Sequence, residues 1–244
     1  MNFDQIEDKM KSAWMERSKI RSCFINDSTG NLFSQNDRKY IITCRHVADG
    51  FFTDKKQYVL LRDNKKIPKS DLKYLARSNK SIDIAIIEIL NHDEISNFYS
   101  LEDFEIIEDF NQEVKKETSY FVFGYPEQLK YEKNGKEFIL WMSYLTIMNK
   151  SISSNQDFLY LDYPIDSEKN IITENKLKTI LPKAPGLSGA FIFRIECFKE
   201  EKGKLWLPSF AKIIAIQSSW NEKSWLKGCN TKHLFELLKK ENAT

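Results

Sequence analysis

Short apolar runs separated by turn residues are the feature that most restricts how this chain can fold. The runs are too short for most helices and are rich in β-branched and aromatic residues, which favour strands. They lie at residues 20–25, 40–43, 58–61, 82–90, 120–123, 138–148, 158–161, 190–195 and 213–216. Between them stand turn signals such as Asp27-Ser28-Thr29-Gly30-Asn31, Asp63-Asn64, Asn134-Gly135 and Lys202-Gly203. Many short strands without long helices between them predict a mainly β sandwich or barrel.

Helical patterns are confined to the two ends of the chain. A helix is expected over residues 1–17, because apolar residues recur there at the spacing of one helical face; they are Phe3, Ile6, Met10 and Trp14. A second helix is expected within residues 229–244, with a cap and an apolar face formed by Asn230 or Thr231 and by Leu234, Leu237 and Leu238. We expect the rest to form one domain of two β lobes, residues 18–115 and 116–228, connected near the acidic stretch 93–117.

The composition excludes several classes of protein. With 41% hydrophobic and 13% aromatic residues, the chain is too apolar to be disordered, and a net charge of +2 over 244 residues gives no reason to expect a nucleic-acid partner. It has no uninterrupted apolar run of about 18 residues and no signal-peptide pattern, so we expect no membrane partner and a cytoplasmic location. The four cysteines form no CxxC pair, which predicts reduced thiols and no structural zinc site. We expect no other metal site and no cofactor.

The most specific candidate for chemistry is a serine in a glycine-flanked turn. The stretch Pro185-Gly186-Leu187-Ser188-Gly189 stands just before the apolar run 190–195, so the Ser188 hydroxyl would lie at the mouth of a strand. Acyl transfer needs a hydroxyl and two backbone N–H groups aimed at the developing oxyanion, and glycine permits the required backbone angles. The N–H groups of Gly186 and Ser188 are the candidate donors. Taken alone, a Gly-x-Ser-Gly tetrapeptide is more often an ordinary turn.

A serine hydroxyl needs a base, and His46 is the best-placed histidine. It directly follows the predicted strand 40–43, whereas His92 and His233 are expected on the surface. Asp83 is the matching carboxylate, because it interrupts an apolar run and needs a partner there to offset its desolvation. Judged singly, His46 would more often be a histidine that is merely satisfied at a strand edge. Asp83 alone is equally well explained as a solvated residue at the start of a strand.

Together these settings resemble the trypsin-like serine peptidases of the chymotrypsin fold. In that family the base follows a strand in a Thr-Ala-x-His motif, the aspartate opens an Asp-Ile-Ala-Leu strand, and the nucleophile lies in Gly-x-Ser-Gly. The matching stretches stand in the family order and are Ile42-Thr43-Cys44-Arg45-His46-Val47, Asp83-Ile84-Ala85-Ile86-Ile87 and Gly186-Leu187-Ser188-Gly189, with further similarity at 122–126 and 213–216. The resemblance implies two six-stranded antiparallel β-barrels, and its character is closest to intracellular bacterial trypsin-like peptidase domains.

By this resemblance the chain would be a serine endopeptidase that cleaves peptide bonds through an acyl-enzyme. Ser188 would be the nucleophile, His46 the general base and Asp83 the residue that orients the histidine. The implied substrate contacts are Pro182 and Lys183 in one wall of the specificity pocket, and Gln217, Ser218 and Ser219 in a strand that pairs with an extended substrate. A protein or peptide substrate is therefore the expected partner, and an activating partner protein is a further candidate.

Two other functions stay open from the sequence. One is a catalytically weak or inactive binding module that keeps the double barrel, an idea motivated by Arg45 beside His46 and by Ala190-Phe191 after the nucleophile turn. The other is an esterase, which the same residues would permit. Activation by N-terminal cleavage is not expected, because Leu187 stands where secreted digestive relatives carry an aspartate. A bacterial stress or defence role is suggested by analogy.

Overall fold

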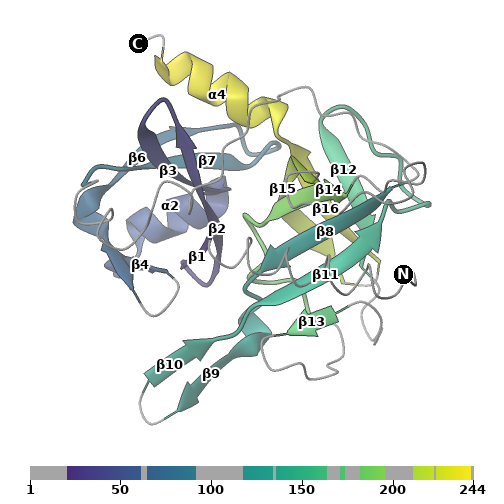
Figure 1. Ribbon diagram of the computed structural model, residues 1–244, viewed down its shortest axis with the longest axis horizontal. Coiled ribbons are helices and arrows are strands. Elements are labelled where there is room, and N and C mark those ends of the chain that lie inside the picture. The colour runs from purple at the N-terminus through teal and green to yellow at the C-terminus, as the bar shows by residue number, and fades with distance from the viewer. Residues whose placement is uncertain are drawn as a thin grey trace, which may run out of the picture.

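The protein is a mainly β molecule of two lobes. The computed structural model describes residues 21–61, 65–91, 118–133, 136–163, 171–173, 182–195, 211–222 and 224–242. The helix expected at 1–17, the connection expected at 93–117 and His92 lie outside these residues. Two seven-stranded antiparallel sheets form the lobes, and a two-stranded hairpin projects from the second lobe (Figure 1). In the described ranges, no helix is long and apolar enough to cross a membrane.

The first sheet is built from the strands that flank the candidate base and carboxylate. Its strands are β1 (Ser22–Ile25), β2 (Ser28–Gln35), β3 (Arg38–Cys44), β4 (Tyr58–Leu60), β5 (Lys66–Pro68), β6 (Leu72–Arg77) and β7 (Ile84–Ile89). They are paired in the order β5-β4-β1-β2-β3-β7-β6. The helix α2 (Arg45–Thr53) follows β3 directly and buries Val47, Ala48 and Phe51, and a 3₁₀ turn, η2 (Lys69–Asp71), precedes β6.

The prediction of a turn over residues 27–31 is wrong for most of that stretch. Only Asn26 and Asp27 turn the chain, with φ of 47° and 57°, and β2 begins at the next residue. A two-residue hairpin turn needs left-handed backbone at both central positions, which Asn and Asp tolerate better than most residues. A second Asn-Asp pair, at 36–37, closes the hairpin between β2 and β3 in the same way. Thr29 and Asn31 therefore belong to a strand.

The second sheet carries the candidate nucleophile turn between two of its strands. Its members are β8 (Ser119–Gly124), β11 (Met142–Ile147), β12 (Phe158–Asp162), β13 (Ile171–Thr173), β14 (Phe191–Ile195), β15 (Ala211–Asn221) and β16 (Trp225–Asn230), in the order β12-β16-β15-β14-β8-β11-β13. A 3₁₀ turn, η4 (Glu127–Leu129), leads into the projecting hairpin of β9 (Lys130–Lys133) and β10 (Lys136–Ile139). The expected fold class, a mainly β chain with two curled antiparallel sheets as in the chymotrypsin-like fold, is confirmed, although each sheet has seven strands where six were expected.

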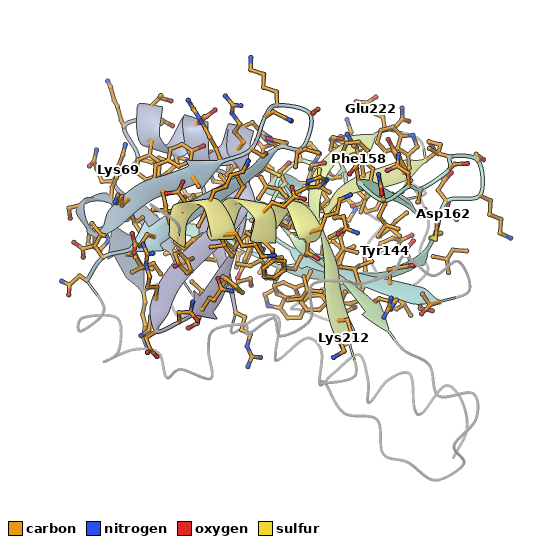
Figure 2. All side chains as sticks on the ribbon, turned by 90° about the horizontal axis from the view of Figure 1, so that it is seen from above. Lys69, Tyr144, Phe158, Asp162, Lys212 and Glu222 are labelled. Carbon is orange, nitrogen blue, oxygen red and sulfur yellow. The ribbon has the colours of Figure 1, made fainter. Side chains whose placement is uncertain are left out.

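The C-terminal helix ties the two lobes together. The predicted helix is present as α4 (Lys232–Asn242), and the side chain of Asn230 caps it by accepting the Lys232 N–H at 2.9 Å. It follows β16 of the second sheet and packs on β6 and β7 of the first, so that in Figure 2 it lies in front of the first lobe, with its beginning at the second. Its apolar residues Leu234, Phe235 and Leu238 join a core cluster to which both sheets contribute. This shared core buries apolar side chains from both lobes.

Removing a buried α4 side chain should therefore destabilise the whole molecule. Leu238 is 2% exposed within the shared cluster, so Leu238→Ala is expected to lower the free energy of unfolding by about 2–5 kcal/mol. The measurement is denaturant unfolding followed by fluorescence and by circular dichroism. Lys239→Ala, on the exposed side of the same helix, is the matched control and should change stability by less than about 1 kcal/mol. Equal effects of the two changes would contradict this account of α4.

Candidate active site

His46 lies in the first turn of α2, immediately after β3 ends at Cys44. Cys44 supplies no side-chain cap to the helix. The carboxylate of Asp83 takes that place, because its Oδ1 accepts the His46 backbone N–H at 3.0 Å. Its Oδ2 is 2.7 Å from Nδ1 of the His46 ring, so a single carboxylate both caps the helix and orients the imidazole. The His46 side chain remains 54% exposed and the Asp83 side chain 16% exposed.

Asp83 reaches this position through a strained backbone conformation. Its φ is 58°, in the left-handed region, which Asp tolerates at some cost. The preceding turn fixes that conformation: Asn79 accepts the Ile82 N–H with its side chain and the Asp83 N–H with its backbone carbonyl, at 3.0 Å each. The Asp83 carbonyl in turn accepts the Arg45 N–H at 3.1 Å. The turn therefore aims the carboxylate at the start of α2.

Ser188 stands in a tight turn between two glycines with the same unusual backbone conformation. Gly186 and Gly189 both have φ of +94°. A Cβ on Gly186 would lie 2.3 Å from the Tyr125 carbonyl oxygen, and one on Gly189 would lie 2.1 Å from the Thr29 carbonyl oxygen. Both positions therefore require glycine for space as well as for φ. Ser188 itself is half-buried, and the neighbouring Leu187 side chain is fully buried as an anchor.

The two lobes meet at the backbone of this turn. The Thr29 N–H of β2 donates to the Ser188 carbonyl at 3.1 Å. The Gln217 carbonyl of β15 accepts both the Gly189 N–H at 2.8 Å and the Cys44 thiol at 3.0 Å. The nucleophile turn is thus linked to β3, two residues before His46. No hydrogen bond joins the Ser188 hydroxyl to the His46 ring within the described ranges, and such contacts are often longer before substrate binds.

Two buried side chains that hold the turn escaped the sequence reading. Thr29 Oγ1 donates to the Gly186 carbonyl at 2.8 Å, and Asn31 Nδ2 donates to the Gly189 carbonyl at 2.6 Å. Both come from the same face of β2, since they are two residues apart in a strand. The composition of residues 27–31 predicts a turn there. The sequence signal for this strand is the pair of Asn-Asp hairpin turns on either side of β2.

The residues expected to contact substrate have distinct surroundings. Pro182 is buried, and its carbonyl accepts the Tyr163 hydroxyl at 2.8 Å. Lys183 is exposed, and its backbone N–H donates to the Gln128 side chain at 2.6 Å. Ser218 is 6% exposed at an irregularity in the β15–β16 pairing, and Gln217 is fully buried. The next residue along β15, Ser219, is exposed.

Cys44, His46 and Asp83 form the one cluster, in the described part of the chain, whose side-chain atoms are close enough for a metal ion, within 4.8 Å of one another. A metal ion there would break the hydrogen bond between His46 and Asp83. It would also have to deprotonate Cys44, whose pKa is raised well above its ordinary value by burial and by the nearby Asp83 carboxylate. The arrangement suits proton transfer better than metal binding.

Comparisons with known proteins bear on the fold. No protein-family model and no curated protein matches the sequence. A solved structure from work on the intrinsically disordered Sesbania mosaic virus VPg protein has a TM-score of 0.50 at 12% identity, covering 88% of this chain and 87% of that chain. An inactive form of a serine-to-alanine mutant of Rv3671c from M. tuberculosis H37Rv also has a TM-score of 0.50 at 12% identity, covering 95% and 91%.

A serine protease of a human pathogenic astrovirus is a third structural match, with a TM-score of 0.43 at 12% identity over 87% of this chain and 90% of that chain. At such identities the likeness concerns the fold alone. Together with the two seven-stranded sheets, the first two matches agree with a two-barrel chymotrypsin-like fold.

The three described cysteines should be unreactive in the folded protein. Cys23, Cys44 and Cys229 are free and buried, and burial raises the pKa of all three, that of Cys229 to about 11. Because the thiolate is the reactive form, iodoacetamide at about pH 8 should modify none of them until denaturant is added. Peptide mass mapping measures this.

The same pKa shifts give a direction for stability. A thiol with a raised folded-state pKa contributes its full stability below its ordinary pKa of 9.0, and this contribution decreases as the pH rises toward about 11. The free energy of unfolding should therefore fall over that alkaline range.

For the labelling experiment, rapid modification of Cys44 or Cys229 by iodoacetamide in the folded protein would contradict the burial of these thiols.

Proposed function

We propose that this chain is a serine hydrolase of the endopeptidase type, with Ser188 as nucleophile, His46 as general base and Asp83 as its orienting carboxylate. The observation that carries the proposal is the 2.7 Å contact between the His46 ring and Asp83, in a site where the neighbouring strand is bonded to the Ser188 turn. Acyl transfer by a serine requires a base held by a carboxylate, and His46 with the largely buried Asp83 supplies that pair.

The contact with Asp83 determines what the His46 ring can do. Nδ1 carries the proton that is donated to the carboxylate, so Nε2 keeps its lone pair and is the atom that would take the Ser188 proton. Ser188 Oγ then bonds to the substrate carbonyl carbon, and the scissile C–N bond breaks as His46 returns the proton to the leaving amine. Water attacks the resulting ester by the same route. Asp83 stabilises the imidazolium during both steps.

The Ser188 turn supplies the candidate donors for the oxyanion. Among the hydrogen bonds of the described residues, none engages the N–H of Gly186 or of Ser188. The Pro185 carbonyl is turned away, because it accepts the Glu127 N–H at 2.8 Å. In a trans peptide the N–H points opposite to the carbonyl, so the Gly186 N–H is directed to the other side of this peptide plane. Two free, preorganised donors are what a tetrahedral intermediate needs.

A free strand edge beside the turn favours a peptide as the substrate. β14 pairs with β15 only as far as Ile216, whereas β16 pairs with it to Asn221. Beyond Ile216, one edge of β15 thus has no neighbouring strand among those described. The backbone of Gln217 is already bonded, its N–H to the Ala190 carbonyl at 2.8 Å. We therefore assign substrate pairing to Ser218 and Ser219, with Gln217 as their support.

The remaining elements of the proposal follow from charge and exposure. Pro182 brings no charge to the proposed pocket wall, and Lys183 is exposed to solvent. Arg45 does not counter the base, because its guanidinium bonds Asp49 Oδ2 at 3.2 Å and the Ser78 carbonyl at 3.0 Å. This weakens the case for an inactive module. Free thiols agree with a reducing compartment, so a cytoplasmic location is part of the proposal.

Covalent labelling tests the nucleophile directly. A fluorophosphonate probe should attach to wild-type protein at Ser188, because that reaction needs the activated hydroxyl, and peptide mass mapping should locate the adduct there. Ser188→Ala should remove labelling without changing the unfolding midpoint. Folded wild-type protein that takes up no probe and turns over neither peptides nor activated esters would overturn the proposal, and turnover of esters alone would favour an esterase.

Exchange of the carboxylate for an amide tests the role of Asp83. Asp83→Asn keeps an oxygen that can accept the His46 backbone N–H and so preserve the start of α2, but it favours the wrong ring tautomer. We expect kcat to fall about 10⁴-fold with KM little changed. Steady-state kinetics measures this, with thermal unfolding as the check on the fold. A variant that keeps more than a tenth of wild-type kcat would show that Asp83 is structural only.

A further inference from the structure

Thr29 is a first-lobe residue whose polar atoms are used mainly by the second lobe. It is fully buried in β2. Its N–H donates to the Ser188 carbonyl at 3.1 Å, and its Oγ1 lies 2.8 Å from the Gly186 carbonyl and 3.0 Å from the Tyr125 nitrogen. Its own carbonyl accepts the Thr43 hydroxyl at 2.8 Å. Every hydrogen-bonding group of Thr29 is therefore engaged.

The direction of the Thr29 hydroxyl proton follows from these partners. The Tyr125 nitrogen is a backbone N–H and can only donate, so Oγ1 accepts from it. The single hydroxyl proton is then given to the Gly186 carbonyl. The second lobe leaves room for this contact at Gly124, where a Cβ would lie 2.7 Å from Thr29 Oγ1. This hydrogen bond keeps the Gly186 carbonyl directed toward β2.

Gly186 needs such an external restraint more than most residues. It has no side chain and its φ is +94°, so its backbone can rotate between several conformations. The peptide plane before it is fixed by the Glu127 N–H on the Pro185 carbonyl. The plane after it is fixed by the Thr29 hydroxyl on the Gly186 carbonyl and by the Leu187 N–H on the Ala184 carbonyl, 2.9 Å away. Rotation at Gly186 would break at least one of these contacts.

We propose that the Thr29 hydroxyl is a positioning group that holds the Gly186–Ser188 turn with its free N–H groups facing the reacting carbonyl. This inference rests on the function proposed for Ser188. The first lobe would then contribute the conformation of the turn as well as the base and its carboxylate. Asn31, which holds the Gly189 carbonyl from the same face of β2, restrains the other end of the turn.

Two substitutions separate the hydroxyl from the shape of the side chain. Thr29→Val keeps the shape and removes the hydroxyl, and Thr29→Ser keeps the hydroxyl and removes the methyl group. Misplacement of a reacting group by a distant change typically costs about 10²-fold. We therefore expect kcat and the rate of fluorophosphonate labelling to fall about 10²-fold in Thr29→Val with KM little changed. Thr29→Ser should stay within a few-fold of wild type.

The pH profile distinguishes positioning from a general structural effect. None of the hydrogen bonds given for Thr29 involves His46 or Asp83, so the pH midpoint of kcat/KM in Thr29→Val should equal that of wild type while the plateau falls. A shifted midpoint would place the effect on the base and overturn the inference. If Thr29→Val does not fold, Thr29→Ala, which removes both the hydroxyl and the methyl group, is measured in its place and compared with Thr29→Ser.

Amide hydrogen exchange provides a readout that needs no catalysis. The Leu187 N–H, bonded to the Ala184 carbonyl, should exchange faster in Thr29→Val than in wild type and be unchanged in Thr29→Ser. Protection of Leu187 that is unaltered in Thr29→Val, or labelling of that variant at the wild-type rate, would overturn the role of Thr29. A third outcome is that wild-type protein is never labelled, while the Leu187 N–H still exchanges faster in Thr29→Val than in wild type. This outcome would overturn the proposed function and leave the positioning role of Thr29 supported.

Discussion

The Asp83 carboxylate is the group on which the geometry of this site depends. One oxygen accepts the backbone N–H of His46, and the other lies 2.7 Å from Nδ1 of its ring. A carboxylate that is largely withdrawn from water needs charge-assisted hydrogen bonds to offset its desolvation, and His46 supplies both. To present two oxygens to one residue, Asp83 adopts a left-handed backbone, which the turn around Asn79 and the start of α2 together stabilise. The Asp83 carboxylate therefore both caps α2 and orients the His46 ring, and the strained backbone of Asp83 is what allows it to do so.

The contact between the lobes imposes the second constraint, because it is made of buried polar groups. Leaving such a group without a partner costs about 1–3 kcal/mol, so a small displacement of one lobe is penalised several times over. The groups concerned are the Thr29 hydroxyl, the Asn31 amide, the Cys44 thiol and the Gln217 carbonyl. Apolar packing alone would tolerate sliding, whereas directional hydrogen bonds do not. The relative placement of the lobes is thus specified where the Ser188 turn needs it.

The parts of the structure that leave a local pattern could be predicted from sequence. Strand β3 is an apolar run, Asp83 interrupts another, and Ser188 is flanked by glycines that its turn requires. The helix α2 could not be predicted, since its cap is a carboxylate 37 residues away. Thr29 and Asn31 were missed for a related reason. Their partners are backbone carbonyls 157 and 158 residues away, and a backbone carbonyl looks the same in every residue.

The apolar core around α4 and the hydrogen bonds at the Ser188 turn should differ in how easily they open. The shared core around α4 is held by many apolar contacts, and its loss amounts to global unfolding. The Gly186–Ser188 turn is held by single hydrogen bonds, each worth about 1 kcal/mol net. Local opening draws on the least stabilised contacts, so the turn should open while both sheets stay folded. The same few hydrogen bonds join the two lobes and set the direction of the Gly186 and Ser188 N–H groups. A change that shifts one lobe against the other should therefore misdirect these proposed oxyanion donors before it lowers the free energy of unfolding.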